Sequence, residues 1–308
     1  MNLKSRLYLW LQKTVPTIGQ GKYIMLNPWI IIRNKGVLKL SNGYSINFNK
    51  ENKKDIFRAV GFALVNGIRF GESEYSWKLD EKKGIIETHQ GIKFKISAFG
   101  LLDETFLSQI HFSGFDIKDK VVLTAGAYIG DTPLFYSYYG AKVFAFEPDP
   151  NSFNKAIENI DLNPDLKDRI TLKNYAIGQN GEVDFPVEQD SGGSSIFETR
   201  NKKTIKIKSK SIGDILNEFN ISNPFLLDLD IKGSEFDVIL DDAISKFKKV
   251  RIEYSIYLVR DHKKSLKFLI DKMREYGFNN IRIYKHNNLR VDLTEHGTLE
   301  ALWQSFMD

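Results

Sequence analysis

The chain has 308 residues, which is enough for one large domain or two of ordinary size. Hydrophobic residues make up 42% and charged residues 27% of it, close to globular averages, so extensive disorder and fibrous repeats are excluded. There is no cysteine, which excludes disulfides, cysteine-ligated zinc, iron–sulfur clusters and thiol nucleophiles. The net charge of +5 permits contact with nucleic acid or an anionic membrane but requires neither, because 44 basic and 39 acidic residues largely offset one another.

No apolar stretch reaches the length of a membrane-spanning helix, which needs about 18 consecutive apolar residues. The apolar run at residues 7–11 stops at Gln12 and Lys13, so it is too short for the hydrophobic region of a secretory signal. A packed N-terminal helix is favoured for this run over a helix that lies on a membrane surface. We therefore expect a cytoplasmic protein without a transmembrane segment.

The pattern of residues 1–118 predicts a small α+β region that caps or extends a larger domain. Residues 37–48 are typical of a hairpin, because Asn42-Gly43 suits a tight turn. A helix is expected at residues 55–65, and three short strands are expected at 75–79, 85–88 and 92–96. No motif in this region indicates a function.

From residue 119 to residue 308, short apolar runs alternate with helical patterns. We expect strands at 121–123, 143–146, 170–177, 226–231 and 250–257. Helices are expected at 132–139, 151–162 and 262–276. The chain then predicts a closing antiparallel hairpin from 281–284 and 289–293. This order predicts an α/β fold with a mostly parallel sheet, and the final antiparallel pair favours a Rossmann-like seven-stranded methyltransferase sheet.

The strongest functional signal is the turn after the first of these strands. Gly126 has no side chain, so a ligand could lie against the backbone there, and Gly130 permits a tight turn and close approach of a helix. About twenty residues later the second strand ends at Glu147, where nucleotide-binding folds hold a ribose with a carboxylate. A dinucleotide would require a second glycine at position 128, which is Tyr128. S-adenosylmethionine, which has no phosphate, is therefore the favoured ligand.

Several motifs, in the expected order, resemble the FkbM family of S-adenosylmethionine-dependent methyltransferases. They occupy residues 126–132, 145–150, 174–178, 211–216, 230–235 and 252–254. The resemblance covers about residues 105–290, and the first third of the chain has no matching motif. It implies transfer of a methyl group from S-adenosylmethionine, usually to a hydroxyl oxygen of a sugar or another small metabolite.

The resemblance also implies a set of cofactor-binding positions. These are Thr124, Gly126, Ala127, Gly130, Glu147, Tyr175 and Ala176. The glycine turn would face the methionine and ribose, Glu147 would hold the ribose, and Tyr175 with Ala176 would flank the adenine. At position 124 the family usually has an aspartate that helps to hold the charged amino group of the cofactor. Threonine can accept a hydrogen bond there but carries no charge.

A second departure from the family is Lys232, which stands where a glutamate is usual. It reverses a charge beside the expected pocket. Three interpretations remain open: selection of an acidic acceptor, an ion pair with Asp228 or Asp230, or loss of catalysis.

Carboxylates at strand ends are the candidates for catalysis, because a hydroxyl acceptor benefits from a base that removes its proton as the new bond forms. We assign this role to Asp230, Glu235 and Glu253. Asp228 and Asp230 could share one side of the strand and hold Mg²⁺, but we favour an ion pair between Asp228 and a neighbouring lysine, and assign no metal site. His262 and the loop residues Ser194 and Ser195 are weaker candidates, and His296 is assigned no role.

The sequence thus predicts an O-methyltransferase acting on a hydroxyl of a sugar, glycan or related small metabolite, with no nucleic acid as partner. One alternative is a non-catalytic binding protein with the methyltransferase fold, which Thr124 and Lys232 motivate. The other is a nucleic-acid methyltransferase, disfavoured because Asn223-Pro224-Phe225 precedes the fourth strand and lacks the second proline of the usual signature. The oligomeric state is left open.

Overall fold

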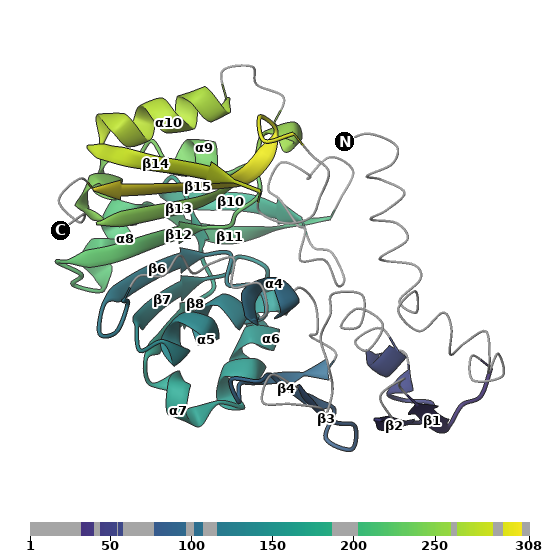
Figure 1. Ribbon diagram of the computed structural model, residues 1–308. Coiled ribbons are helices and arrows are strands. Elements are labelled where there is room, and N and C mark those ends of the chain that lie inside the picture. The colour runs from purple at the N-terminus through teal and green to yellow at the C-terminus, as the bar shows by residue number, and fades with distance from the viewer. Residues whose placement is uncertain are drawn as a thin grey trace. The chain divides into compact units, whose positions relative to one another are not determined.

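The structure, a computed structural model, divides the chain into two compact units, Met1–Gln109 and Ile110–Asp308 (Figure 1). The residues that it describes are 32–39, 44–53, 55–57, 77–96, 102–106, 116–186, 203–259, 264–285 and 292–303. The candidates His262, Ser194 and Ser195 and the apolar run at 7–11 lie outside these residues. Within them, no helix is both long enough and apolar enough to cross a membrane.

The described part of the first unit is a small α+β arrangement, as predicted. Its elements are β1 (Gly36–Lys39), β2 (Ser45–Phe48), β3 (Lys78–Asp80), β4 (Ile85–Glu87), β5 (Lys93–Lys95) and α4 (Leu102–Phe106). β1 pairs with β2 and β3–β4–β5 form a meander, all antiparallel. Every second side chain of these strands is buried, as expected for a sheet with one face covered and one exposed. Examples are Leu38, Ile46, Ile86 and Phe94.

The second unit is built on a seven-stranded sheet with the order β14-β15-β13-β12-β6-β7-β8. Its strands are β6 (Val121–Ala125), β7 (Lys142–Phe146), β8 (Ile170–Lys173), β12 (Pro224–Leu229), β13 (Lys249–Ser255), β14 (Phe278–Tyr284) and β15 (His296–Trp303). β15 pairs antiparallel with β13 and with β14, and the other neighbours pair parallel. The predicted seven-stranded, mostly parallel sheet with an antiparallel strand near one end is confirmed.

Two strand predictions are wrong in detail. The strand expected at 170–177 is divided into β8 and β9 (Ala176–Ile177), and β9 belongs to a separate three-stranded sheet with β10 (Gly181–Pro186) and β11 (Thr204–Lys210). The last strand begins at His296, whereas it was expected at 289–293; Leu293 lies in a turn. The hairpin connection is therefore longer than a tight-turn pattern predicts, which brings different residues into the sheet.

Helices cover the sheet on both faces, as the alternating pattern predicts (Figure 1). They are α5 (Asp131–Tyr138), α6 (Pro150–Asp161), α7 (Pro164–Lys167), α8 (Ile212–Glu218), α9 (Glu235–Val238) and α10 (Leu266–Glu275), with 3-10 turns at Asp242–Lys246 and Ile256–Leu258. α6 begins where Asp149 accepts hydrogen bonds from the amides of Asn151 and Ser152. α10 begins at a Ser265 cap, later than the expected start at residue 262.

The two faces of the central strands differ in chemistry. On β13, Val250, Ile252 and Tyr254 point into the apolar core formed with α8, α9 and α10. The alternate residues Lys249, Arg251, Glu253 and Ser255 share the opposite face and are equally buried. A buried charge is costly unless it is paired, so each charged side chain on this face needs a partner.

Asp228 on β12 is paired with Arg251, the residue opposite it on β13, at 2.5 Å between carboxylate and guanidinium. The Tyr136 hydroxyl of α5 donates to the second carboxylate oxygen at 2.8 Å. A second buried pair joins Lys249 to Glu300 at 3.1 Å. The expectation that Asp228 pairs with a lysine is wrong; an arginine on the adjacent strand takes that place, so this carboxylate is structural.

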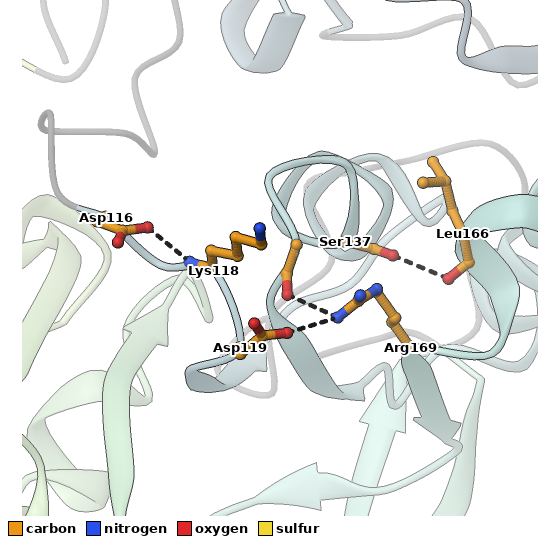
Figure 2. Close-up of polar contacts among 7 residues, drawn as sticks. Asp116, Lys118, Asp119, Ser137, Leu166 and Arg169 are labelled. Carbon is orange, nitrogen blue, oxygen red and sulfur yellow. Dashed lines mark hydrogen bonds and ion pairs between the residues drawn. The ribbon is translucent and has the colours of Figure 1, made fainter.

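At the amino-terminal edge of the sheet, Arg169 joins segments that precede three strands (Figure 2). Its guanidinium donates to the Gly140 carbonyl at 2.8 Å and lies 3.3 Å from the Asp119 carboxylate. Ser137 of α5 donates to the Leu166 carbonyl at 2.8 Å. These contacts hold the starts of β6, β7 and β8 together, and the motif-bearing turns lie at the other edge.

Candidate functional site at the carboxyl edge of the sheet

The turn after β6 and the end of β7 are joined by backbone and carboxylate hydrogen bonds. The amides of Gly126 and Ala127 both donate to the Phe146 carbonyl, at 2.9 and 3.1 Å. The carboxylate of Glu147 accepts from the amide of Tyr128 at 2.7 Å. Its other oxygen accepts from the amide of Asp149 at 2.9 Å. Glu147 therefore links the glycine turn to the start of α6.

Burial makes the charge of Glu147 costly and raises the pKa of its carboxyl to about 8. The amides of Asp149 and Tyr128 oppose this shift by donating to the carboxylate, while the negative charges of Asp149 and Asp131 reinforce it. A carboxylate offers about four lone-pair positions, and two of them are taken by these amides. Further donors, such as a pair of hydroxyls, would fit the remaining positions and favour the charged form.

The protein's own backbone leaves no room for a side chain at Gly126. Its φ is +86°, and a Cβ at this position would lie 2.0 Å from the backbone oxygen of Asp230. The Asp230 amide in turn donates to the Ala125 carbonyl at 3.0 Å. The sequence interpretation, in which the missing side chain makes room for a ligand, needs correction: the space is filled by the backbone that follows β12. The glycine thus lets two neighbouring strand ends meet.

Gly130 allows the close approach of a helix, as expected. Its φ is also +86°, and a Cβ would lie 3.2 Å from the Ala156 oxygen of α6. From the same helix, Asn159 donates its side-chain amide to the Ile129 carbonyl at 2.8 Å. α6 therefore supports the glycine turn from outside.

We predict that Gly126→Ala destabilises the second unit far more than Gly277→Ala. Gly277 has a similar φ of +90°, but its nearest side-chain atoms would be at 3.8 Å, an ordinary contact. Both variants carry the conformational cost of an alanine at positive φ, about 1–2 kcal/mol, and only Gly126→Ala adds a backbone collision. Urea unfolding of both variants measures the difference; equal losses would contradict the close contact with Asp230.

Two residues other than glycine are held in the left-handed conformation in the loops at this edge. Tyr128 after β6 has a φ of 44° and Lys232 after β12 has a φ of 40°. Such conformations cost of order 1–3 kcal/mol and tend to gather at functional sites. Lys232, the departure from the family pattern, thus lies in a strained loop between Asp230 and Glu235.

Glu235, at the start of α9, is fully buried beside the end of β13. One carboxylate oxygen accepts from the Ser255 amide at 2.8 Å. The other is buried and has no partner at hydrogen-bond geometry among the described residues, although the amides of Glu235 and Gly233 also stabilise the charged carboxylate. Burial raises the pKa of Glu235 to about 7, and the charge of Glu253 adds to the shift. A carboxyl that titrates near neutrality is suited to exchange a proton.

The sequence interpretation overlooked His296, which lies next to Glu253. Its Nε2 is 3.8 Å from the Glu253 carboxylate, and its Nδ1 is 2.9 Å from the Tyr254 carbonyl. Both side chains are buried. His296 reaches this edge because β15 runs antiparallel to β13, so the first residue of β15 pairs with the last residue of β13, Ser255. The spacing of histidines along the chain carries no signal for this contact.

The remaining predicted positions lie close to the turn or to β7. Thr124 is buried inside β6, in register with Asp228, and so precedes the loop. The Tyr175 ring stacks on Phe146 at 6.2 Å between ring centroids. Ala176 begins β9. The Tyr175 ring is also approached by two lysines of β11, Lys208 at 5.0 Å and Lys210 at 5.2 Å. Phe146 and two lysines of β11 therefore lie beside this partly exposed ring.

Asn174, which lies just before Tyr175, ties the end of β8 to the end of β7. Its side-chain amide donates to the Glu147 carbonyl at 2.8 Å and to the Pro148 carbonyl at 3.0 Å. The sequence interpretation treated Asn174 only as part of a motif. In the structure it holds the backbone of the residue that is expected to bind the ribose.

The model of the methyltransferase FkbM domain matches residues 125–279. The hexuronic acid methyltransferase AglP of Haloferax volcanii is 32% identical over 140 residues, which are 44% of this chain and 56% of AglP. The 2-O-methyltransferase NoeI of Sinorhizobium fredii is 25% identical over 220 residues, 63% of this chain and 88% of NoeI. The chain thus spans little more than half of the length of AglP.

Among solved structures, the methyltransferase FkbM from Methylobacillus flagellatus is similar to this chain, with a TM-score of 0.43 and 20% identity. The alignment covers 64% of this chain and 47% of that one.

Proposed function

Because this chain belongs to the FkbM methyltransferase family, we propose that it transfers a methyl group from S-adenosylmethionine to a hydroxyl oxygen of a sugar, glycan or related small metabolite. The observation that carries the proposal is the position of two buried carboxyls, Glu147 after β7 and Glu235 after β12, on either side of the glycine turn. The names of two relatives support the acceptor class, since one is a hexuronic acid methyltransferase and the other a 2-O-methyltransferase.

The side chains at this edge fit a cationic, hydroxyl-bearing ligand and do not fit a pyrophosphate. Acidic residues dominate the loops after β6, β7 and β12, including Asp131, Glu147, Asp149 and Asp230. Carboxylates accept hydrogen bonds and attract positive charge, so they suit ribose hydroxyls, an ammonium group and a sulfonium. S-adenosylmethionine, when bound, supplies an electrophilic methyl group. The proposed contacts are Glu147 to the ribose, the turn from Gly126 to Gly130 along the methionine, and Tyr175 with Ala176 beside the adenine.

In the proposed mechanism, Glu235 is the general base for the acceptor hydroxyl. Its oxygen without a hydrogen-bond partner among the described residues would accept the hydroxyl proton as the acceptor oxygen bonds to the methyl carbon. The carbon–sulfur bond of the sulfonium would break in the same step, and S-adenosylhomocysteine would leave. We assign Asp230, which follows β12, and Glu253, near the end of β13, to orienting the acceptor. Holding the acceptor oxygen and the methyl carbon in line lowers the activation free energy by on the order of 7–11 kcal/mol. This orientation supplies most of the rate enhancement, and the base lowers the barrier further.

Methyl transfer is tested with the full chain, S-adenosylmethionine and a panel of glycosides with uronic acid or neutral sugars, by detecting the methylated product by mass spectrometry. We expect Glu235→Gln to lower kcat by about 10²–10⁴-fold with little change in affinity for S-adenosylhomocysteine. Asp237→Asn on the same helix is the matched control, because that carboxylate is partly exposed and pairs with Lys264. Binding of the cofactor without turnover of any acceptor would instead indicate a binding protein.

A further prediction concerns pH. Because the pKa of Glu147 is raised to about 8 in the free protein, most of the population is protonated at pH 7. Ribose hydroxyls donate to the charged form, so binding should release a proton and the affinity for S-adenosylhomocysteine should rise as the pH approaches 8. Calorimetry in buffers of different ionisation enthalpy measures the released protons. An affinity that falls over this range would contradict the assignment of Glu147 to the ribose.

A further inference from the structure

The carboxyl edge of the sheet contains a second ionisable pair, formed by His296 and Glu253. These residues come from adjacent antiparallel strands, β15 and β13, and each is at most 6% exposed. The Nε2 atom of His296 lies 3.8 Å from the Glu253 carboxylate. Water would screen the interaction between such a pair. Because both side chains are buried, the electrostatic interaction between them is stronger here.

The two ring nitrogens of His296 have different neighbours. Nδ1 lies 2.9 Å from the Tyr254 carbonyl, which can only accept, so this nitrogen carries a proton in both the neutral and the charged ring. Nε2 lies 3.8 Å from the Glu253 carboxylate, which is beyond hydrogen-bond length but within ion-pair distance. An opposite charge this close favours the charged form of the ring, so a second proton on Nε2 places a positive charge next to Glu253.

Glu235 shares this cluster. It is bound to the backbone of Ser255, and the Ser255 hydroxyl lies 3.4 Å from Nδ1 of His296. The negative charge of Glu253 raises the pKa of Glu235. A positive charge on His296 acts in the opposite direction. Among the described residues, the ring of Tyr257 also approaches His296, edge-on at 5.8 Å between ring centroids.

We propose that His296 is a positioning residue of this site, whose imidazolium charge offsets Glu253 and so sets the proton affinity of Glu235. The inference depends on the proposed function at one point, because that proposal makes Glu235 the general base. The charge balance itself is a property of the free protein, and it can be measured without an acceptor or a cofactor. The two partners of the pair should therefore act on Glu235 in opposite directions.

The test is a carboxyl ¹³C NMR titration of protein labelled at glutamate, with the Glu235 signal assigned through Glu235→Gln. We expect His296→Gln to move the titration midpoint of Glu235 upward by about one pH unit and Glu253→Gln to move it downward. The double variant should return close to the wild type, because both charges are then gone. An unchanged midpoint in His296→Gln, or a downward shift, overturns the proposal.

A measurement on the unaltered protein covers the case in which the variants do not fold. The chain has only five histidines, so the ¹⁵N signals of the His296 ring can be resolved. We expect both ring nitrogens to carry protons at pH 7, and a neutral ring at that pH overturns the proposal. Activity serves as a separate readout: in His296→Gln the acidic limb of the pH–rate profile should follow the Glu235 midpoint. Absence of methyl transfer in the wild type would count against the proposed function and leave the titration result standing.

Discussion

Replacing Glu147 with alanine is expected to lower the affinity for S-adenosylhomocysteine by about 10²–10⁴-fold. The carboxylate contributes twice, as the proposed acceptor for the ribose and as the group that holds the glycine turn through the Tyr128 and Asp149 amides. Hydrogen bonds to a charged group contribute about 1.5–3 kcal/mol each, so losing the two proposed bonds from the ribose hydroxyls lowers the affinity by this factor. Isothermal titration calorimetry with the demethylated cofactor measures it directly.

The matched control for this variant is Glu158→Ala, which removes the same charge from an exposed position on α6. Its affinity should stay close to that of the wild type. Thermal unfolding of both variants separates a local loss of binding from a loss of fold. If Glu147→Ala retained an affinity within a factor of three of the wild type, the ribose site would have to lie elsewhere and the central proposal would fail.

Replacing Arg251 with methionine is expected to lower the free energy of unfolding of the second unit by about 3–5 kcal/mol. The reason is that the Asp228 carboxylate would remain buried in the middle of the sheet with its cation removed, and Tyr136 supplies a single hydrogen bond to it. For a unit of this size each kcal/mol lowers the melting temperature by about 2–4 °C, so a large shift should be visible in a thermal scan.

Two further variants identify the cause. Lys206→Met breaks an ion pair with Asp184 whose partners are 61% and 54% exposed, and should cost less than about 1 kcal/mol. Combining Arg251→Met with Asp228→Leu should restore much of the lost stability, because an apolar pair of similar volume no longer contains an uncompensated charge. A double variant as unstable as Arg251→Met alone would show that packing, and not charge, dominates at this position.

Much of the fold follows from patterns that are local in sequence. The strand before Gly126, the helix after Gly130 and the strand before Glu147 were each predicted within a few residues of their observed bounds. These elements depend on hydrophobic period, on turn residues and on short connections, all of which are written into neighbouring residues. The cap at Asp149 and the proline after it define the start of α6 in the same way.

Errors arose where a long-range contact decides the outcome. The partner of Asp228 is an arginine 23 residues away, because the register between β12 and β13 places them opposite each other. A sequence pattern identifies both strands but does not specify their register. Gly126 shows the same limit: its positive φ suits a turn, yet the close contact with Asp230 exists only because β12 is the neighbour of β6.

Sequence alone thus determined the α/β class, the order of the main elements, the glycine turn and the acidic residue about twenty positions later that suggests a ribose site. Only the tertiary structure decided that His296 meets Glu253 and that Glu235 lies against the last residue of β13. The physical reason is that an antiparallel strand inserted between parallel ones returns a distant segment to the carboxyl edge. Side chains about 40 residues apart in the chain then share one buried environment, where their charges act on one another strongly.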